Sequence, residues 1–402
     1  MKKVNNYNFS DAVVLTGGIG SRLGAITKKT PKPLIKIGRK LFLDYILLNI
    51  SRYGFKKIYL LCCYQHQKFF KIYNKKIING CQIICVNEKT PRGTGGGLLL
   101  LKKKISNFFL LLNGDTYFDI NYFDLFIELK KNRNALGIVA LAQKNGSRFL
   151  SMDTNSQKIL KNSKKNSNFI NSGIYIFNKK ILKFIDRKIF SLENELFPKL
   201  LNKKKLLGKK YFNKKIKFID IGIKKDLKIA KKLIPNLQKK PAFFLDRDGV
   251  INHDFGYVHK IKDFKWRGNI IKCIKYLNDK GYYIFVVSNQ SGIGRGYYKE
   301  EQVIQLHDWV QRVLKDFGAH IDKFYYAPYF SGNKKYCKKD KLLRKPNLGM
   351  IKMALKNWPI DMSKSFMVGD SKIDELLSKK AKIKFIKIKP QTNLLNILKN
   401  KL

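Results

Sequence analysis

The stretch FFLDRDGVIN, residues 243–252, decides the fold of the second half of the chain. An apolar run stops there, and Asp246 and Asp248 follow with one residue between them. In open parallel sheets, ligands bind outside the carboxyl ends of the strands. Two carboxylates at such an end, with Gly249 allowing the chain to turn, suit Mg²⁺, which prefers hard oxygen ligands. We therefore predict a buried strand that ends at a magnesium site.

Further polar residues follow predicted strands or lie in loops of the same half. Ser288 ends the run YYIFVVS, and Lys345 lies in LLRKPN. Asp370 ends MVGD, and Asp374 lies four residues on, where it could orient the set. Each piece alone has a plainer explanation, since a lone Asp-x-Asp is often a turn and an aspartate after a strand often caps a helix. Together they favour transfer of a phosphoryl group to a carboxylate.

This half resembles the haloacid dehalogenase superfamily of phosphatases. DRDGVIN, GYVHKIKDF, SNQSGIGRGYY and RKPNLGM look like the branch that contains D-glycero-D-manno-heptose 1,7-bisphosphate phosphatase and histidinol phosphatase. The resemblance implies that Asp246 is the nucleophile and Asp248 the general acid and base. It implies Mg²⁺ ligands from Asp246, the backbone carbonyl of Asp248, and Asp370, with Ser288 and Lys345 holding the phosphoryl group. The residues it places along the substrate are Asp254, Tyr257, Asn289, Gln290, Arg295 and Arg344.

Many members of that branch carry a zinc loop before the Arg-Lys-Pro motif, built from a Cys-x-His pair and a later Cys-x-Cys pair. Here Ala327 and Tyr329 stand in place of the first pair, and Lys341 and Leu343 in place of the second. Cys337 is a single thiol in that stretch, and one thiol cannot build a tetrahedral site. We therefore predict no structural zinc.

A glycine-rich loop, VVLTGGIGSRLG at residues 13–24, lies near the N-terminus. It is neither a Walker A loop nor a dinucleotide fingerprint, but its glycines let backbone amides approach phosphate oxygens. Arg22 and Lys32 add positive charge nearby, and Asp115 and Asp220 each follow a predicted strand. The set predicts in-line attack of a sugar phosphate on the α-phosphorus of a nucleoside triphosphate, with Mg²⁺ bound and pyrophosphate leaving.

The glycine-rich loop followed in order by PKP, NGD, INSG and DIG resembles the sugar-1-phosphate nucleotidyltransferases, over about residues 10–235. The residues that this resemblance implies are Gly17, Gly18, Gly20, Arg22 and Lys32 for the triphosphate, Gly95 for the base, Asn171 and Gly173 for the sugar, and Asp115 and Asp220 for Mg²⁺. The usual proline after the Arg-Leu pair is absent, and so is the usual Glu-Lys pair before INSG. Lys165 is the candidate to replace the lysine, and Glu193 and Glu195 are the candidate carboxylates.

The whole chain of 402 residues reads as α/β, with apolar runs alternating with amphipathic segments. We predict a nucleotidyltransferase domain at residues 1–235, Rossmann-like with a mixed sheet. A phosphatase domain at 236–402 is expected to hold a doubly wound parallel sheet. The stretch KKLIPNLQKKPA, around Pro235 to Pro241, is predicted to join them.

The formal net charge of +55 would attract nucleic acid, but no nucleic-acid motif accompanies it. Abundant Lys, Asn and Ile are instead typical of an AT-rich genome, so we expect no specific nucleic-acid partner. No apolar run reaches the roughly 18 residues of a membrane span, and the polar start does not fit a signal peptide. Six cysteines without a framework indicate reduced thiols and a cytoplasmic enzyme. The oligomeric state is left open.

Two such modules on one chain favour consecutive reactions. Removal of the 7-phosphate from a heptose bisphosphate leaves heptose 1-phosphate, which a nucleotidyltransferase activates for a bacterial surface polysaccharide. GTP is the nucleotide that this route implies. Three alternatives remain: a phosphatase for another monoester such as histidinol phosphate, an N-terminal half that is weak or serves as a scaffold, and a basic surface that binds nucleic acid or membrane.

Overall fold

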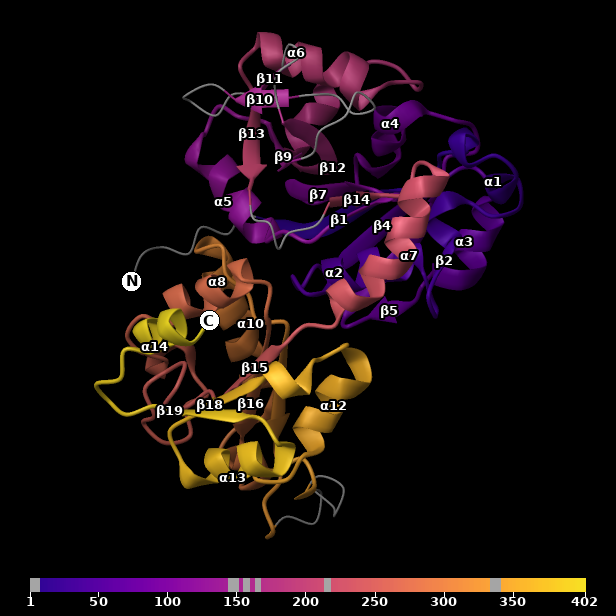
Figure 1. Ribbon diagram of the computed structural model, residues 1–402. Coiled ribbons are helices and arrows are strands. Elements are labelled where there is room, and N and C mark those ends of the chain that lie inside the picture. Colours follow the sequence, from indigo (N-terminus) through magenta and orange to yellow (C-terminus); the bar gives the residue numbers. More distant parts are fainter. Residues whose placement is uncertain (1–7, 144–151, 155–159, 163–167, 213–217, 333–340) are drawn as a thin grey trace. The chain divides into compact units, whose positions relative to one another are not determined.

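The computed structural model describes residues 8–143, 152–154, 160–162, 168–212, 218–332 and 341–402. The chain forms two compact units, divided between Leu237 and Gln238. Figure 1 colours them along the sequence, with the first unit from indigo to pink and the second from orange to yellow. The expected two-domain α/β architecture is confirmed.

The N-terminal unit is built on a mixed sheet of eight strands in the order β13-β9-β12-β7-β1-β4-β6-β5. Parallel pairing joins β1 to β4 and β7, while β12 runs antiparallel to β7 and β9. The strands are β1 (Phe9–Leu15), β4 (Lys57–Cys62), β5 (Ile77–Ile78), β6 (Cys81–Asn87), β7 (Phe108–Asn113), β9 (Gly137–Gln143), β12 (Phe169–Asn178) and β13 (Leu206–Tyr211). The mixed sheet that the sequence predicted is therefore present.

Each face of this sheet is covered by its own apolar core, because side chains alternate along a strand. On β1, Ala12 and Val14 pack in one core, and Val13 packs in the other. The first core takes residues from helices α2 (Phe42–Ser51), α3 (His66–Tyr73), α5 (Tyr122–Lys131) and α7 (Lys224–Gln238). The second takes residues from η3 (Gly97–Leu101), η4 (Lys179–Phe184), η5 (Leu192–Leu196) and α6 (Phe197–Asn202).

Short elements complete the N-terminal unit. A two-stranded ladder pairs β8 (Thr116–Phe118) with β14 (Phe218–Asp220), so that Asp220 lies opposite Thr116. The others are η1 (Ser21–Leu23), α1 (Ala25–Lys29), η2 (Lys32–Leu34), β2 (Lys36–Ile37), β3 (Lys40–Leu41), α4 (Gly93–Gly96), β10 (Met152–Thr154) and β11 (Leu160–Asn162). The ladder matters for function because it brings the backbones after Asn113 and at Asp220 together.

The C-terminal unit contains five parallel strands in the order β17-β16-β15-β18-β19. They are β15 (Ala242–Leu245), β16 (Tyr283–Asn289), β17 (Lys323–Ala327), β18 (Phe366–Gly369) and β19 (Lys384–Lys387). The strand order reverses between β15 and β18, which makes the carboxyl end of β15 the switch point of a doubly wound sheet. The stretch DRDG follows β15 at that point.

Helices cover this second sheet. They are η6 (Ile261–Asp263), α8 (Ile270–Asp279), α9 (Ser291–Gly294), α10 (Glu300–Asp316), α12 (Gly349–Asn357), η7 (Met362–Lys364), α13 (Lys372–Ala381) and α14 (Leu394–Lys401). Phe243 and Leu245 of β15 pack in one core with residues of α8, α10 and α14. Phe244 points the other way and stacks obliquely on Phe285, with ring centroids 5.5 Å apart.

The predicted junction differs in one respect from the structure. Pro235 lies inside helix α7, which continues to Gln238. A proline removes one helical hydrogen bond, but Leu227, Ala230 and Ile234 anchor the same helix in the core. Tertiary packing therefore outweighs the local proline signal. Within the described ranges, no helix has both the length and the apolar content needed to cross a membrane.

Candidate active sites

The C-terminal candidate site lies where three neighbouring strands end. Asp246 follows β15, and its N–H donates to the carbonyl of Val368 on β18 at 3.0 Å. Ser288 is the penultimate residue of β16, and Asp370 follows β18 directly. Since the strands are parallel, their carboxyl ends share one edge of the sheet. The chain thus delivers two acids and a hydroxyl to one place.

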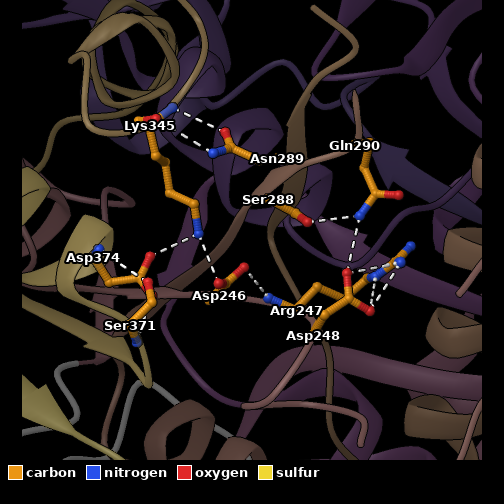
Figure 2. Close-up of polar contacts among 9 residues, drawn as sticks. All are labelled: Asp246, Arg247, Asp248, Ser288, Asn289, Gln290, Lys345, Ser371 and Asp374. Carbon is orange, nitrogen blue, oxygen red and sulfur yellow. Dashed lines mark hydrogen bonds and ion pairs between the residues drawn. The ribbon is translucent and has the colours of Figure 1, made fainter. Parts of the chain in front are cut away.

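Lys345 lies at the centre of this site (Figure 2). Its Nζ is 2.8 Å from Asp246 Oδ2 and 2.7 Å from Asp374 Oδ1. The residue is only 4% exposed. Asn289 holds its backbone from both sides, accepting from the Lys345 N–H at 2.9 Å and donating to the Lys345 carbonyl at 3.3 Å. The ammonium is therefore fixed by its own main chain as well as by two carboxylates.

Asp374 is the buried anchor of the lysine. Ser371, the N-cap of α13, donates its hydroxyl to Asp374 Oδ2 at 2.6 Å, and Asp374 also reaches the Ser371 N–H. This reciprocal capping box fixes the start of the helix. The other oxygen of Asp374 is thereby turned toward Lys345. The contact agrees with the expected orienting role of Asp374.

Burial and neighbouring charges set the protonation of this cluster. Burial disfavours the charged ammonium of Lys345, but Asp246 and Asp374 outweigh it and raise the pKa of the lysine. Burial also raises the pKa of Asp246 to about 7, with Lys345 opposing the rise and Asp374 adding to it. Burial raises the pKa of Asp370 as well, and the charges of Asp374 and Asp254 contribute. A bound cation would reverse the shifts of both acids.

Two acids at strand ends and one in helix α13 form a cluster that fits a divalent cation. One oxygen from each of Asp246, Asp370 and Asp374 lies within 4.8 Å of the others. Asp374 is fully buried between Lys345 and Ser371, whereas Asp246 is partly exposed and Asp370 exposed, so these last two are the more accessible ligands. Gly249 has a φ of +80°, and a Cβ there would come within 1.9 Å of Asp370 Oδ2. The Asp248–Gly249 backbone thus passes directly beside the Asp370 carboxylate, where its carbonyl can complete the set.

Asp248 is held by a separate group of donors. Arg247 Nη2 lies 3.0 Å from Asp248 Oδ1 and 2.9 Å from Oδ2. Asn252 donates to Oδ1 at 2.9 Å, and Gln290 donates to Oδ2 at 3.1 Å. Arg247 is 1% exposed, which makes it a fully enclosed partner. Sequence reasoning named neither Arg247 nor Asn252 for the site, since their direction depends on the turn after β15.

The predicted substrate-lining residues are placed less uniformly. Asp254, Tyr257 and Arg295 are exposed, and Arg344 is partly exposed. Tyr257 meets Tyr297 edge to face at 4.9 Å, while the Arg295 guanidinium lies 4.0 Å from the ring centroid of Phe330. Asn289 and Gln290 direct their amides to protein groups instead. In the stretch where related phosphatases carry a zinc loop and none is predicted here, Ala327 ends β17 and Cys337 lies outside the described residues.

The N-terminal candidate site is a cavity of about 170 Å³. It gathers the glycine-rich loop, the PKP segment, the GTGGG segment and the NGD segment from four places in the sequence. Its lining residues are Leu15, Thr16, Gly18, Gly20, Lys32, Pro33, Thr94, Asn113 and Asp115. The order of motifs in the sequence therefore corresponds to a shared cavity.

Lys32 and Asp115 form the charged pair of this cavity. Lys32 Nζ is 3.0 Å from Asp115 Oδ2, and Lys32 is 7% exposed. Gly20 has a φ of +74°, and a Cβ there would come within 2.7 Å of the Lys32 side chain. Glycine is thus favoured at this position for two reasons: the backbone has a positive φ, and the Lys32 side chain packs where a Cβ would lie. Arg22 lies in the exposed η1 turn, and Gly17 is partly exposed next to the cavity.

Asp220 approaches Asp115 through the backbone ladder. The Ile221 N–H donates to the Asp115 carbonyl at 3.0 Å, and Asp220 Oδ1 accepts from the Gly222 N–H at 2.8 Å. The carboxylates of Asp115 and Asp220 are hard oxygen donors on neighbouring segments, which is the chemistry that Mg²⁺ prefers.

Gly95 contacts the segment after η4, and the sugar motif contacts the rest of β12 and the end of β7. The Gly95 N–H donates to the Phe190 carbonyl at 2.9 Å. Thr94, its neighbour in GTGGG, lines the cavity. Asn171 donates to the Tyr175 hydroxyl at 2.9 Å. Gly173 has a φ of +72°, and a Cβ there would come within 2.5 Å of Asn113 Nδ2. The INSG motif therefore packs on a residue of the cavity wall.

Glu193 and Glu195 point to different partners. Glu193 Oε2 accepts from Thr94 Oγ1 at 2.7 Å, and Glu193 Oε1 lies 3.5 Å from the Tyr175 hydroxyl. Glu195 pairs with Arg187 and accepts from the Ser191 N–H at 2.7 Å. Only the first glutamate contacts a residue of the cavity wall. The other candidate, Lys165, lies outside the described residues.

Glu88 is a further acid that sequence reasoning missed. It is 5% exposed, and burial raises its pKa to about 7, with Arg92 opposing the rise. A Cβ on Gly17 would come within 3.2 Å of one carboxylate oxygen, and a Cβ on Gly97 within 2.1 Å of the other. The carboxylate thus lies between the two glycine-rich segments. Only the fold brings these segments together, so no local pattern marked Glu88.

Residues 11–236 match the family model described as nucleotidyl transferase. The chain belongs to the nucleotidyl transferase family. Residues 241–385 match a second family model, described as polynucleotide kinase 3 phosphatase. The two matches fall on the two units of the fold, and both predicted resemblances are confirmed at the level of the domains.

Several curated proteins are similar to the C-terminal domain. The D-glycero-beta-D-manno-heptose-1,7-bisphosphate 7-phosphatase of Pasteurella multocida (strain Pm70) is 46% identical over 36% of this chain and 79% of that protein. A D-glycero-alpha-D-manno-heptose-1,7-bisphosphate 7-phosphatase of Photorhabdus laumondii is 43% identical over 33% of this chain and 72% of that protein. The C-terminal domain belongs to the family of these phosphatases. Among solved structures, HddC from Yersinia pseudotuberculosis is 27% identical, with 56% of this chain and 99% of that chain covered and a TM-score of 0.48.

Proposed function

We propose that the chain performs two consecutive steps in the activation of a heptose. The C-terminal domain removes the 7-phosphate of D-glycero-D-manno-heptose 1,7-bisphosphate. The N-terminal domain then transfers a nucleotidyl group to the heptose 1-phosphate that remains. The observation that carries the first step is the buried Lys345, fixed between Asp246 and Asp374 at the switch point of the sheet.

In the phosphatase step, an oxygen of Asp246 attacks the phosphorus of the 7-phosphate, and the bond from phosphorus to the sugar O7 breaks. Asp248 gives its proton to that leaving oxygen. Asp248 then takes a proton from the water that hydrolyses the aspartyl phosphate, which restores both aspartates and releases inorganic phosphate. Lys345 and Ser288 bind the phosphoryl oxygens that gain charge during both transfers.

In the nucleotidyl step, a phosphate oxygen of heptose 1-phosphate attacks the α-phosphorus of the triphosphate, and pyrophosphate leaves. Lys32 and the glycine-rich loop hold the phosphates, so the reaction needs positioning rather than a covalent enzyme intermediate. Cations held by Asp246, Asp370 and the Asp248 carbonyl, and by Asp115 and Asp220, would neutralise phosphate charge in the two sites.

We also propose that Glu193 supplies a carboxylate for the sugar, in place of the glutamate of the absent Glu-Lys pair. It contacts Thr94 on the cavity wall and lies near Tyr175, which Asn171 of the INSG motif contacts in turn. A carboxylate in this place can accept hydrogen bonds from adjacent sugar hydroxyls. Glu195 is turned to Arg187 and the Ser191 backbone instead.

The nucleotide and the cellular setting follow from the proposed route. GTP is the triphosphate that we propose, and the activated heptose would serve a surface polysaccharide such as lipopolysaccharide. Both reactions use phosphorylated, water-soluble compounds, which fits an enzyme of the cytoplasm. Since relatives carry both alpha and beta names, both anomers of the bisphosphate belong in the test.

The decisive experiment supplies heptose 1,7-bisphosphate, GTP and Mg²⁺ to the full chain and follows phosphate, pyrophosphate and sugar nucleotide. We expect all three products. Asp246→Asn should abolish phosphate release yet leave nucleotidyl transfer from preformed heptose 1-phosphate intact. Phosphate without pyrophosphate, with every nucleoside triphosphate tried, would refute the second step. If Asp246→Asn removes both activities from a folded protein, the proposal of two separate sites is wrong.

A further inference from the structure

Gln290 is enclosed between the residues of the phosphatase site. It directly follows β16, is 2% exposed, and donates its N–H to the Ala327 carbonyl at 2.8 Å. Its side-chain amide lies between Ser288 and Asp248, as Figure 2 shows. A side chain this enclosed offers little surface to a substrate, so its effect must pass through its neighbours.

The contacts fix which way the amide points. Nε2 lies 3.1 Å from Asp248 Oδ2 and 2.8 Å from Ser288 Oγ, while Oε1 accepts from the Tyr298 hydroxyl at 2.9 Å. Arg247 already occupies the Asp248 carboxylate, and in the ionised form, which follows proton donation, that carboxylate only accepts hydrogen bonds, so the NH₂ is the group that faces it. Its second hydrogen then falls on Ser288 Oγ. The reverse orientation would place an amide oxygen against the Asp248 carboxylate.

This orientation has a consequence for Ser288. Because Ser288 Oγ accepts from Gln290, the hydroxyl hydrogen must point to another acceptor. Ser288 lies across the site from Lys345, with Asp246 near both (Figure 2). When Asp246 attacks the phosphorus of a phosphoryl group held by Lys345, an oxygen of that group would be an acceptor for this hydrogen. A serine hydroxyl can donate or accept a hydrogen bond. The Gln290 amide thus directs the Ser288 hydroxyl to act as a donor toward the phosphoryl group.

We propose that Gln290 is a positioning residue that couples the two halves of phosphoryl transfer. One amide hydrogen holds Asp248 where it can give a proton to the leaving oxygen. The other directs the Ser288 hydroxyl toward the phosphoryl group. Arg247 and Asn252 hold Asp248 from its other side, so Gln290 alone joins Asp248 to the phosphoryl-binding hydroxyl among the contacts of the described residues. The inference rests on the proposed phosphatase function.

The leaving group separates this role from a merely structural one. A sugar alkoxide needs a proton as it leaves, whereas p-nitrophenolate does not. General acid catalysis contributes roughly 10²–10⁴-fold to such reactions. We expect Gln290→Leu to lower kcat for the heptose bisphosphate by about 50-fold and kcat for p-nitrophenyl phosphate by about fivefold or less.

Two further variants test whether the effect is specific to the Gln290 contacts. Gln311→Leu removes a glutamine with two comparable hydrogen bonds, to the Ile321 N–H and carbonyl, and should leave both rates near wild type. Tyr298→Phe removes the hydroxyl that donates to Gln290 Oε1, and should cause a smaller loss with the same preference for the sugar ester. This variant keeps the test open if Gln290→Leu does not fold.

The outcomes are distinct. An equal loss for both esters, or no loss for either, in a folded Gln290 or Tyr298 variant of an active enzyme overturns the positioning role. If the wild-type chain hydrolyses neither ester, the phosphatase proposal fails and this inference fails with it. A loss of about 50-fold for the sugar ester together with a small loss, up to about fivefold, for p-nitrophenyl phosphate supports the coupling.

Discussion

The two sites hold their central lysines in different ways. Lys345 lies between two carboxylates, and its backbone is bound on both sides by Asn289. Lys32 has one carboxylate partner, Asp115, and borders a cavity. Covalent phosphoryl transfer needs a nucleophile fixed before the substrate arrives, whereas nucleotidyl transfer needs room for a triphosphate. The difference predicts that removing each lysine or its partner will have different costs in the two domains.

The largest effect is expected for Lys345→Met. The change leaves Asp246 and Asp374 buried without their shared cation, which should cost about 3–5 kcal/mol of stability in the C-terminal domain. Phosphate release should fall by at least about 1,000-fold, since the lysine is also proposed to bind the phosphoryl group. Calorimetry and a phosphate assay measure both, with exposed Lys352→Met as the control. A variant that keeps a tenth of wild-type phosphate release contradicts the central place given to Lys345.

A smaller effect is expected for Asp115→Asn. Nucleotidyl transfer should fall about 100-fold or more, because Asp115 is the partner of Lys32 and is also proposed to hold the metal ion. Stability should change little, as Lys32 borders the cavity and keeps an amide oxygen to contact. Pyrophosphate release from heptose 1-phosphate and GTP measures the loss, and phosphate release in the same sample is the control. Unchanged pyrophosphate release would remove Asp115 from the proposed site.

Glu193→Gln should weaken binding of the sugar phosphate without affecting binding of the nucleotide. The amide can still accept from Thr94, so the wall of the cavity is kept, but a charged acceptor for sugar hydroxyls is lost. We expect KM for heptose 1-phosphate to rise about 10-fold with KM for GTP unchanged. Glu195→Gln on the same short helix is the matched control and should leave both constants alone. Equal changes in both KM values would point to a structural role instead.

Glu88 is expected to act on stability alone, through the pH dependence of unfolding. Its pKa is about 7 in the folded chain against an ordinary value of 4.5, so the folded state holds a proton that the unfolded state releases. The N-terminal domain should therefore lose stability as pH rises from about 4.5 to about 7, by at most about 3 kcal/mol. Glu88→Gln should flatten this slope. Unfolding followed at pH 5 and pH 7.5 measures it, and parallel slopes in the two proteins would contradict the shift.

The sequence was sufficient for the parts of the site that follow from strand ends. Asp246 and Asp370 could be placed together because a parallel sheet brings the ends of its strands to one edge. The order of glycine-rich, PKP and NGD segments likewise predicted a shared site, and the cavity contains all three. In both domains, a short apolar run followed by a polar residue was the informative pattern.

What could not be predicted depends on the directions of side chains. Gln290 reads as a substrate contact in sequence, yet its amide is enclosed between Asp248 and Ser288. Glu193 and Glu195 are equivalent in sequence, and the helical turn of η5 separates them. Pro235 indicated a linker, but the apolar face of α7 kept it helical. Each outcome depends on contacts between distant segments, which local patterns do not encode.

The amide of Asn289 has a consequence for how this family of sites can evolve. It anchors the main chain of Lys345 to the end of β16 as a neighbouring strand would. The ammonium is therefore tied to the end of β16 through its own main chain. Changes elsewhere in the chain can then be tolerated as long as the end of β16 keeps its place, because Asn289 carries the position of the charge proposed to bind phosphate.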